Sequence, residues 1–532
     1  MPHFSEQRGF GAWLRLWPVA LLALAVVGLA AAEVIPTWSG LVYLVGIPPL
    51  DMFADMRLLL VIAPTWPAFI GLVVVLAAVR IAVLAYLLGG LDWRRLRFAG
   101  AFYAIAAGPA LISAQASYMG YAVLYVRIFW ISIAITVLTF IVLAAAPWDG
   151  SLRLRSAVAN GVRSYKRIAA LAGYLFIVAA LGGVAEAIPA LTFGLVILTA
   201  AVTCIVIVVL PRIGSQRSLL WPLPVVLAGA LVFMTVWGVD RLLVREPEPP
   251  TREGSLMVMS GINSSSGNGA AFRLDPTTFG FTCEQMYYYS YAGPGDGAPD
   301  ADAVCEIRTG APFEGSDTHQ PIDQLAENLA LQVEGVPRPL TVVGHSHSAW
   351  IAWLTASTRE NLPVDNVIVF SAFPESGHGY VDAHEEAPGR IASDLLRIIA
   401  PIAIELGMVL AIESPALERM LGDPDGPSEI MRAPLVDHIR GLSIVAATDL
   451  VLMPGGWKIG ADVNACPKWV SHPTLPNAPE VAHEVNRFLD GGAASECRPV
   501  VASVLSAVSR PFGVPRHDQI ERVFSRENSG EA

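Results

Sequence analysis

The stretch from Pro339 to Trp350 reads Pro-Leu-Thr-Val-Val-Gly-His-Ser-His-Ser-Ala-Trp, and it decides the fold of the second half of the chain. Residues 340–343 are apolar or β-branched and predict a buried strand. Residues 344–348 then predict a sharp turn, and residues 349–358 predict a helix. Small residues two before and two after Ser346 let the strand and helix backbones meet closely, which places the serine at the tip of the turn. Ser346 is therefore a candidate nucleophile, and Gly344 is the glycine that the turn needs.

Strands and helices alternate on both sides of this stretch. The predicted strands are residues 255–260, 285–291, 366–370 and 443–447, and the predicted helices include residues 322–333 and 480–489. Such alternation is typical of a mostly parallel sheet that is covered by helices. We therefore expect an α/β domain over residues 253–499.

The composition divides the 532-residue chain into two parts, as its length also suggests. Residues 1–245 contain 17 Lys and Arg against 8 Asp and Glu, whereas residues 246–532 contain 18 against 38. The acidic second part argues against nucleic acid as a partner, because phosphates need a basic surface. Residues 246–252 begin with Glu-Pro-Glu-Pro-Pro and predict a stiff linker between the two parts.

The first part contains seven apolar runs of about the 20 residues that a bilayer crossing requires. They are residues 14–32, 58–79, 98–116, 122–146, 168–188, 190–210 and 219–239. We expect an α-helical transmembrane bundle over residues 1–245, with the lipid bilayer as its partner. Lys and Arg precede the first run and follow the second, fourth and sixth, which predicts a cytoplasmic N-terminus and an extracytoplasmic C-terminal half in the plasma (inner) membrane.

Two details of this topology have alternatives. Ala30-Ala31-Ala32 offers a small-residue cleavage site, so the first run is either a helix or a cleaved signal peptide. Arg80 lies at the soft end of the second run, since residues 81–88 are also apolar. We expect Arg80 to end that helix by extending to the membrane surface; the alternative is a position inside it.

The pattern of the second half changes between residues 374 and 436. Residues 391–412 are strongly apolar and helix-forming, and they predict a helical cap over the strand edges. The alternative is an extra pair of core helices. Residues 500–532 predict a short helix and a polar tail.

Four cysteines lie in the half that we place outside the membrane, which suggests two disulfides. Proximity in the sequence favours Cys283 with Cys305 and Cys466 with Cys497, although three pairings are possible. A zinc site is the rival, but the sequence has no Cys-x-x-Cys spacing. We expect no metal and no cofactor.

Residues 253–492 resemble the α/β-hydrolase superfamily, in which a serine, an acid and a histidine follow one another along the chain. Asp449 resembles the family's acid, because it follows a predicted strand and precedes Leu450-Val451-Leu452-Met453-Pro454. His472 resembles the family's base, since the stretch from Ser471 to Val481 opens the last helix with Pro-Glu-Val. His483 is the competitor for that role.

The resemblance also implies an oxyanion hole of two backbone N–H groups. One is expected from His347, and the other from the loop after the first strand of the domain, at Ile262 or Asn263. Ser348 departs from the family pattern, which has glycine there. This departure puts the geometry of the turn in doubt more than its chemistry.

The resemblance implies a membrane-anchored serine hydrolase that cleaves an ester, thioester or related acyl bond of a small or lipid-like substrate. Ser346, Asp449 and His472 are its expected catalytic residues. The alternatives are an acyltransferase with the same residues and a non-catalytic domain that binds a ligand. The oligomeric state stays open.

Overall fold

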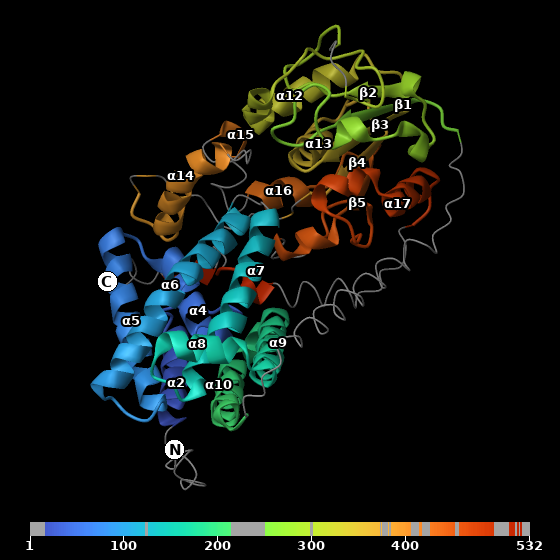
Figure 1. Cartoon of the computed structure of the whole chain (residues 1–532). Helices are drawn as coiled ribbons and strands as arrows, with labels where there is room; N and C mark the ends of the chain where they lie inside the picture. The colour runs from blue at the N-terminus through green and yellow to red at the C-terminus, as the bar shows by residue number, and fades with distance from the viewer. Residues whose placement is uncertain are drawn as a thin grey trace. The chain divides into compact units, whose positions relative to one another are not determined.

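The computed structural model shows a chain that folds into two compact units (Figure 1). It describes residues 16–122, 126–213, 251–297, 302–372, 374, 381, 383, 385–405, 414–417, 426–452, 457–493, 510–515, 519–520 and 522–523. The helical unit comprises Met1–Phe233 together with Tyr380–Pro401 and Ser506–Ala532, and the sheet unit comprises Met234–Gly379 and Ile402–Leu505.

The helical unit contains, among its described residues, five helices that are long and apolar enough to cross a membrane. They are α5 (Trp66–Leu87), α6 (Trp93–Ala122), α7 (Val126–Leu143), α9 (Tyr165–Ala187) and α10 (Thr192–Val209), and α8 (Leu154–Val162) connects two of them. The protein is therefore a membrane protein. The first predicted crossing is the apolar α2 (Trp17–Ala31), whose 15 described residues span only about 22 Å. The seventh, residues 219–239, lies outside the described residues.

The second predicted crossing begins later than the sequence pattern indicated. Residues 58–62 belong to a separate buried helix, α4 (Leu50–Ile62), which follows the short α3 (Leu41–Leu44). Helix α5 starts at Trp66, where the Thr65 side chain accepts a hydrogen bond from the Ala68 N–H at 3.4 Å. Arg80 therefore lies inside α5 and is buried, so the prediction that it ends the helix is wrong. It stays inside because Asp55 of α4 neutralises its charge at 2.8 Å.

Two segments from the C-terminal half complete the helical unit. Helix α14 (Arg390–Glu405) begins in the expected cap, yet residues up to Pro401 belong to this unit. The Trp66 indole donates to the Asp394 carboxylate at 3.0 Å, and the Gln115 amide donates to the Ala392 carbonyl at 2.8 Å. Ser506–Ala532, expected as a tail, also belongs to the helical unit. The structure thus divides the expected cap, because part of its apolar surface packs among the N-terminal helices.

The sheet unit is built on six parallel strands in the order β2-β1-β3-β4-β5-β6. The alternating sequence pattern predicted a mostly parallel sheet, but neither this order nor the short strand β6. The strands are β1 (Ser255–Met259), β2 (Met286–Tyr288), β3 (Leu340–His345), β4 (Asn366–Phe370), β5 (Arg440–Ile444) and β6 (Val463–Asn464). Strands β1 and β3 are buried along their whole length. A strand buried on both faces reads as a continuous apolar run, which explains why β3 was visible in the sequence.

Helix α13 (His347–Thr358) packs between two other helices of the sheet unit. It contacts α12 (Ile322–Val333) and α16 (Gly426–Arg432). The last helix, α17 (Pro479–Leu489), packs against β5. Helix α13 packs against β3 and β4, and its Trp350 and Trp353 are fully buried. A Cβ atom at Gly441 of β5 would lie 3.0 Å from the Trp353 ring, so this ring reaches β5.

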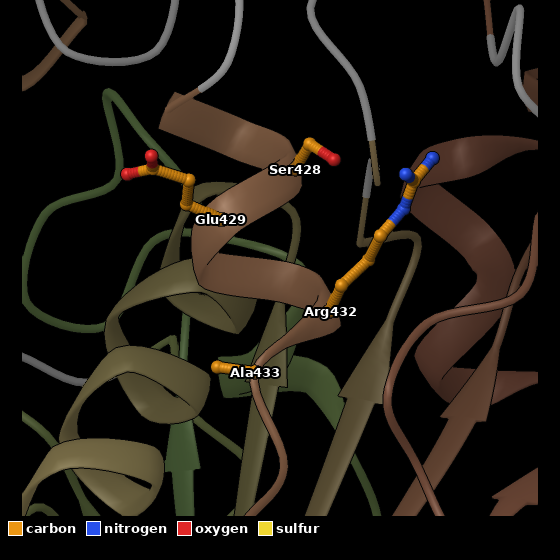
Figure 2. Close-up of a pocket in the computed structure, with 4 residues that line it drawn as sticks. All are labelled: Ser428, Glu429, Arg432 and Ala433. Carbon is orange, nitrogen blue, oxygen red and sulfur yellow. The ribbon is translucent and has the colours of Figure 1, made fainter.

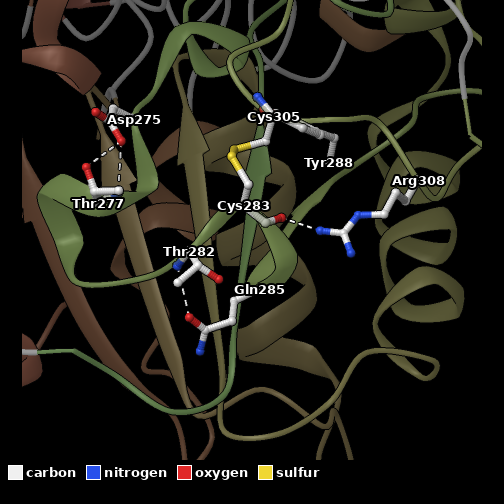
Figure 3. Close-up of a disulfide and its surroundings, with 8 residues drawn as sticks. All are labelled: Asp275, Thr277, Thr282, Cys283, Gln285, Tyr288, Cys305 and Arg308. Atoms are coloured by element: carbon white, nitrogen blue, oxygen red, sulfur yellow. Dashed lines mark hydrogen bonds between the residues drawn. A yellow bond between two sulfur atoms is a disulfide. The ribbon is translucent and has the colours of Figure 1, made fainter.

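A disulfide joins Cys283 and Cys305, which confirms the first predicted pair (Figure 3). It ties the start of β2 to the loop that follows, and the Arg308 guanidinium donates to the Cys283 carbonyl beside it. The second predicted disulfide, between Cys466 and Cys497, stays a prediction. Cys466 is among the described residues, but Cys497 lies outside them.

Candidate active site

Ser346 occupies the sharp turn between β3 and α13. Its backbone has φ 61° and ψ −123°, a conformation that residues other than glycine rarely adopt. The Ser346 N–H donates to the Phe370 carbonyl at 2.9 Å, which fixes the turn to the end of β4. A Cβ atom at position 344 would lie 2.7 Å from the Ser348 carbonyl oxygen and 2.8 Å from the Ala349 Cα, so Gly344 is required.

Ser348 stands where the resembling family has glycine, and the structure accommodates its side chain. The Ser348 hydroxyl donates to the Met259 carbonyl at 2.8 Å and accepts from the His345 N–H at 2.9 Å. The side chain is fully buried and links the ends of β1 and β3. The departure from glycine therefore leaves the sharp turn intact and adds a bond to β1.

The loop after β1 touches the turn after β3. A Cβ atom at Gly261 would lie 3.1 Å from the Ser346 Cβ and 3.6 Å from its Oγ. Strand β1 is flanked by β2 and β3, so the chain order reverses between β1 and β3. In open parallel sheets the crevice at such a reversal, beside the carboxyl ends of the strands, is the preferred place for a ligand.

Asp449 and His472 come together at the same edge of the sheet. Asp449 follows β5, and its carboxylate Oδ2 lies 2.8 Å from His472 Nδ1. Asp449 is fully buried, and Oδ2 also accepts from the Ser371 hydroxyl at 2.6 Å. His483, the competitor, lies exposed on α17.

His345 connects His472 to the turn that carries Ser346. Its Nε2 donates to the His472 carbonyl at 3.0 Å, and the two rings lie 4.9 Å apart. Burial, and then the nearby His472, lower the pKa of His345 to about 3. The neutral ring thus ties the backbone of His472 to the end of β3, one residue before Ser346.

The structure distinguishes the two expected donors of the β1 loop. Asn263 has φ 60°, and its N–H donates to the Thr318 hydroxyl at 2.9 Å. The Ile262 N–H has no hydrogen-bond partner among the described residues. His347 is the first residue of α13, where backbone N–H groups have no acceptor within the helix. Ile262 and His347 therefore retain N–H groups for a ligand.

Two residues at this edge were missed in the sequence. Ser371 holds the Asp449 carboxylate, and the only signal for it is its position just after the predicted strand at residues 366–370. His319 lies in a 3-10 turn, η8 (Gly315–His319), and its Nε2 is 2.7 Å from the Asn263 Oδ1. Nothing in its local sequence predicts this contact, because 56 residues separate the partners.

A separate hollow of about 460 Å³ is lined by three residues of α16 and the residue that follows this helix (Figure 2). Ser428, Glu429 and Arg432 extend from the helix, and Ala433 follows it. None of the residues at the strand ends lines this hollow.

A scan against protein-family models and a search of curated proteins give no match to this chain. The resemblance to α/β-hydrolases therefore rests on the residues and their geometry alone.

Proposed function

We propose that the sheet unit is a serine hydrolase of α/β-hydrolase type, with Ser346 as nucleophile, His472 as base and Asp449 as the acid that orients it. The observation that carries the proposal is the 2.8 Å contact between Asp449 Oδ2 and His472 Nδ1. A carboxylate in that position fixes the tautomer that leaves Nε2 available to accept the serine proton.

In the proposed reaction, Ser346 Oγ attacks the acyl carbon and its proton passes to His472. The amides of Ile262 and His347 stabilise the negative charge that develops on the acyl oxygen. The alcohol or thiol leaves with the proton from His472, and water then cleaves the acyl-enzyme. Of the two residues expected in the loop after β1, we assign this role to Ile262, because the Asn263 N–H already donates to the Thr318 hydroxyl.

The helical unit would hold this hydrolase at the membrane. Basic loops that alternate with acidic ones support an extracytoplasmic position for the sheet unit, and the Cys283–Cys305 disulfide fits an oxidising compartment. A lipid-like acyl substrate is compatible with a position beside the bilayer.

The test is covalent labelling of the full-length protein with a fluorophosphonate. Ser346 Oγ forms a bond to phosphorus, fluoride leaves, and the serine proton passes to His472. We expect labelling of the wild type and its complete loss in Ser346→Ala. Ser357→Ala is the matched control, because Ser357 lies on the same helix α13 and its hydroxyl donates to the Leu354 carbonyl of that helix at 3.2 Å.

A folded wild-type protein that is not labelled would overturn the proposal, as would undiminished labelling of Ser346→Ala. Analysis of the products with an added alcohol separates hydrolysis from acyl transfer.

A further inference from the structure

Two histidines, His347 next to Ser346 in the sequence and His319 of η8, have ring nitrogens without hydrogen-bond partners in the part of the chain that the structure describes. His347 is only 3% exposed, and neither of its ring nitrogens has a partner among the described residues. His319 uses Nε2 to contact Asn263, while its Nδ1 is buried and has no partner in the same part of the chain. Buried polar atoms are rarely left this way unless a ligand or water completes them.

These imidazoles belong to the surroundings of the proposed oxyanion hole. His347 is adjacent to Ser346 in the sequence, and its ring stacks on Tyr291 with centroids 6.1 Å apart. His319 contacts Asn263 in the loop that carries Ile262. Part of the expected cap, α15 (Pro415–Leu417), packs against η8, the segment that carries His319.

The site favours neutral hydrogen-bonding groups over anions. Burial, and then His319, lower the pKa of His347 to about 3, and burial lowers the pKa of His319. Both rings are therefore uncharged near neutral pH. His347 can then donate one hydrogen bond and accept one, whereas His319, whose Nε2 donates to the Asn263 Oδ1, offers Nδ1 as an acceptor. The titratable residues next to His319 in and before η8 are Asp317 and Glu314, so this segment carries no positive charge that would attract an anion.

We propose that His347 and His319 form a subsite that binds hydroxyl groups of a neutral polyol carried by the ester substrate. A hydroxyl both donates and accepts, so it matches neutral imidazoles better than an alkyl chain does. The polyol belongs to either a glycerol headgroup or a sugar, and both present the same chemistry. This inference rests on the proposed serine hydrolase.

The test compares three fluorophosphonates that differ only in one substituent: propyl, 2,3-dihydroxypropyl or a hexose. Rates of labelling are measured on the full-length protein. We expect one polyol probe to label Ser346 at least about tenfold faster than the propyl probe, the gain of roughly one good hydrogen bond. The faster of the two polyol probes identifies glycerol or sugar as the source.

His347→Leu and His319→Leu should bring the ratio of polyol to propyl rates close to one. The ratio removes any general change in the reactivity of Ser346 from the comparison. His483→Leu is the control, because this exposed histidine lies on α17, and it should keep the wild-type ratio.

Labelling by all three probes at equal rates would overturn the subsite while leaving the hydrolase intact. A preference that survives in both leucine variants would do the same. If no probe labels a folded wild type, the proposed function fails and the subsite fails with it.

Discussion

Each unit buries a cluster of polar side chains, and the two clusters differ in how many of their polar atoms have hydrogen-bond partners. In the helical unit, Arg80 donates to both carboxylate oxygens of Asp55 at 2.9 and 2.8 Å, and the Tyr103 hydroxyl donates to Asp51 at 2.7 Å. At the strand ends of the sheet unit, neither ring nitrogen of His347 has a hydrogen-bond partner among the described residues.

The difference follows from charge. A buried ion costs much more free energy than a buried neutral group, so an unpaired Arg or Asp is not tolerated in an apolar surrounding. A neutral imidazole can stay open at a smaller cost and remain ready for a ligand. We call Arg80, Asp55, Asp51 and Tyr103 the helical cluster, and Asp449, His472, His345 and His347 the strand-end cluster. We infer that the helical cluster serves folding, whereas the strand-end cluster serves function.

The largest effect is expected at Asp449, the buried carboxylate of the strand-end cluster. Asp449→Asn keeps the shape but favours the wrong tautomer of His472, so fluorophosphonate labelling should slow by about 10³–10⁴-fold. The rate constant of labelling measures it. Asp437→Asn, an exposed carboxylate ahead of β5, should label like the wild type. A loss of less than tenfold in Asp449→Asn would contradict the proposal that Asp449 orients His472 for the reaction.

The next effect is expected in the helical unit. Arg80→Leu leaves Asp55 and Asp51 buried beside each other, and we expect it to lower the free energy of unfolding by about 3–5 kcal/mol. Thermal or denaturant unfolding in detergent measures the loss. Arg95→Leu removes a partner of Asp92 near the surface and should have a much smaller effect. Equal losses in the two variants would contradict the view that the buried cluster matters for folding.

The last prediction concerns how the stability of the sheet unit depends on pH, and per pH unit its effect is smaller than that of Arg80→Leu. The pKa values of His345 and His347 are lowered to about 3 from 6.5, so between these pH values the unfolded chain binds more protons than the folded one. Stability of the sheet unit should therefore fall as pH drops from 6.5 towards 3, by at most about 1.4 kcal/mol per pH unit for each histidine.

Unfolding measured at pH 7 and pH 5 detects this slope, and His347→Gln should reduce it. His483→Gln should retain it. If the stability did not change between pH 7 and pH 5, the folded chain would bind as many protons as the unfolded one. That result would contradict the view that the two buried imidazoles stay neutral in the folded protein.

Sequence reasoning succeeded where a local pattern carries the structure. Strand β3, its turn and α13 form one continuous stretch, and the positions of Asp449 and His472 follow from the strand and helix next to each. It failed where the partner lies far along the chain. Arg80 was expected at a helix end because Asp55, 25 residues away on a separate helix, is visible only in the folded molecule. His319 and the course of residues 390–401 were missed for the same reason.

Residues 510–515 belong to the helical unit, and their hydrogen bonds to its N-terminal helices can form only late in synthesis. The Arg57 guanidinium donates to the Gly513 carbonyl at 2.6 Å, although 456 residues separate them, and the Ser117 hydroxyl donates to the Phe512 carbonyl at 2.6 Å. A ribosome has therefore made nearly the whole chain before the N-terminal helices receive these acceptors. Until then, the helical unit lacks these two hydrogen bonds. A chain that ends before residue 512 never forms them.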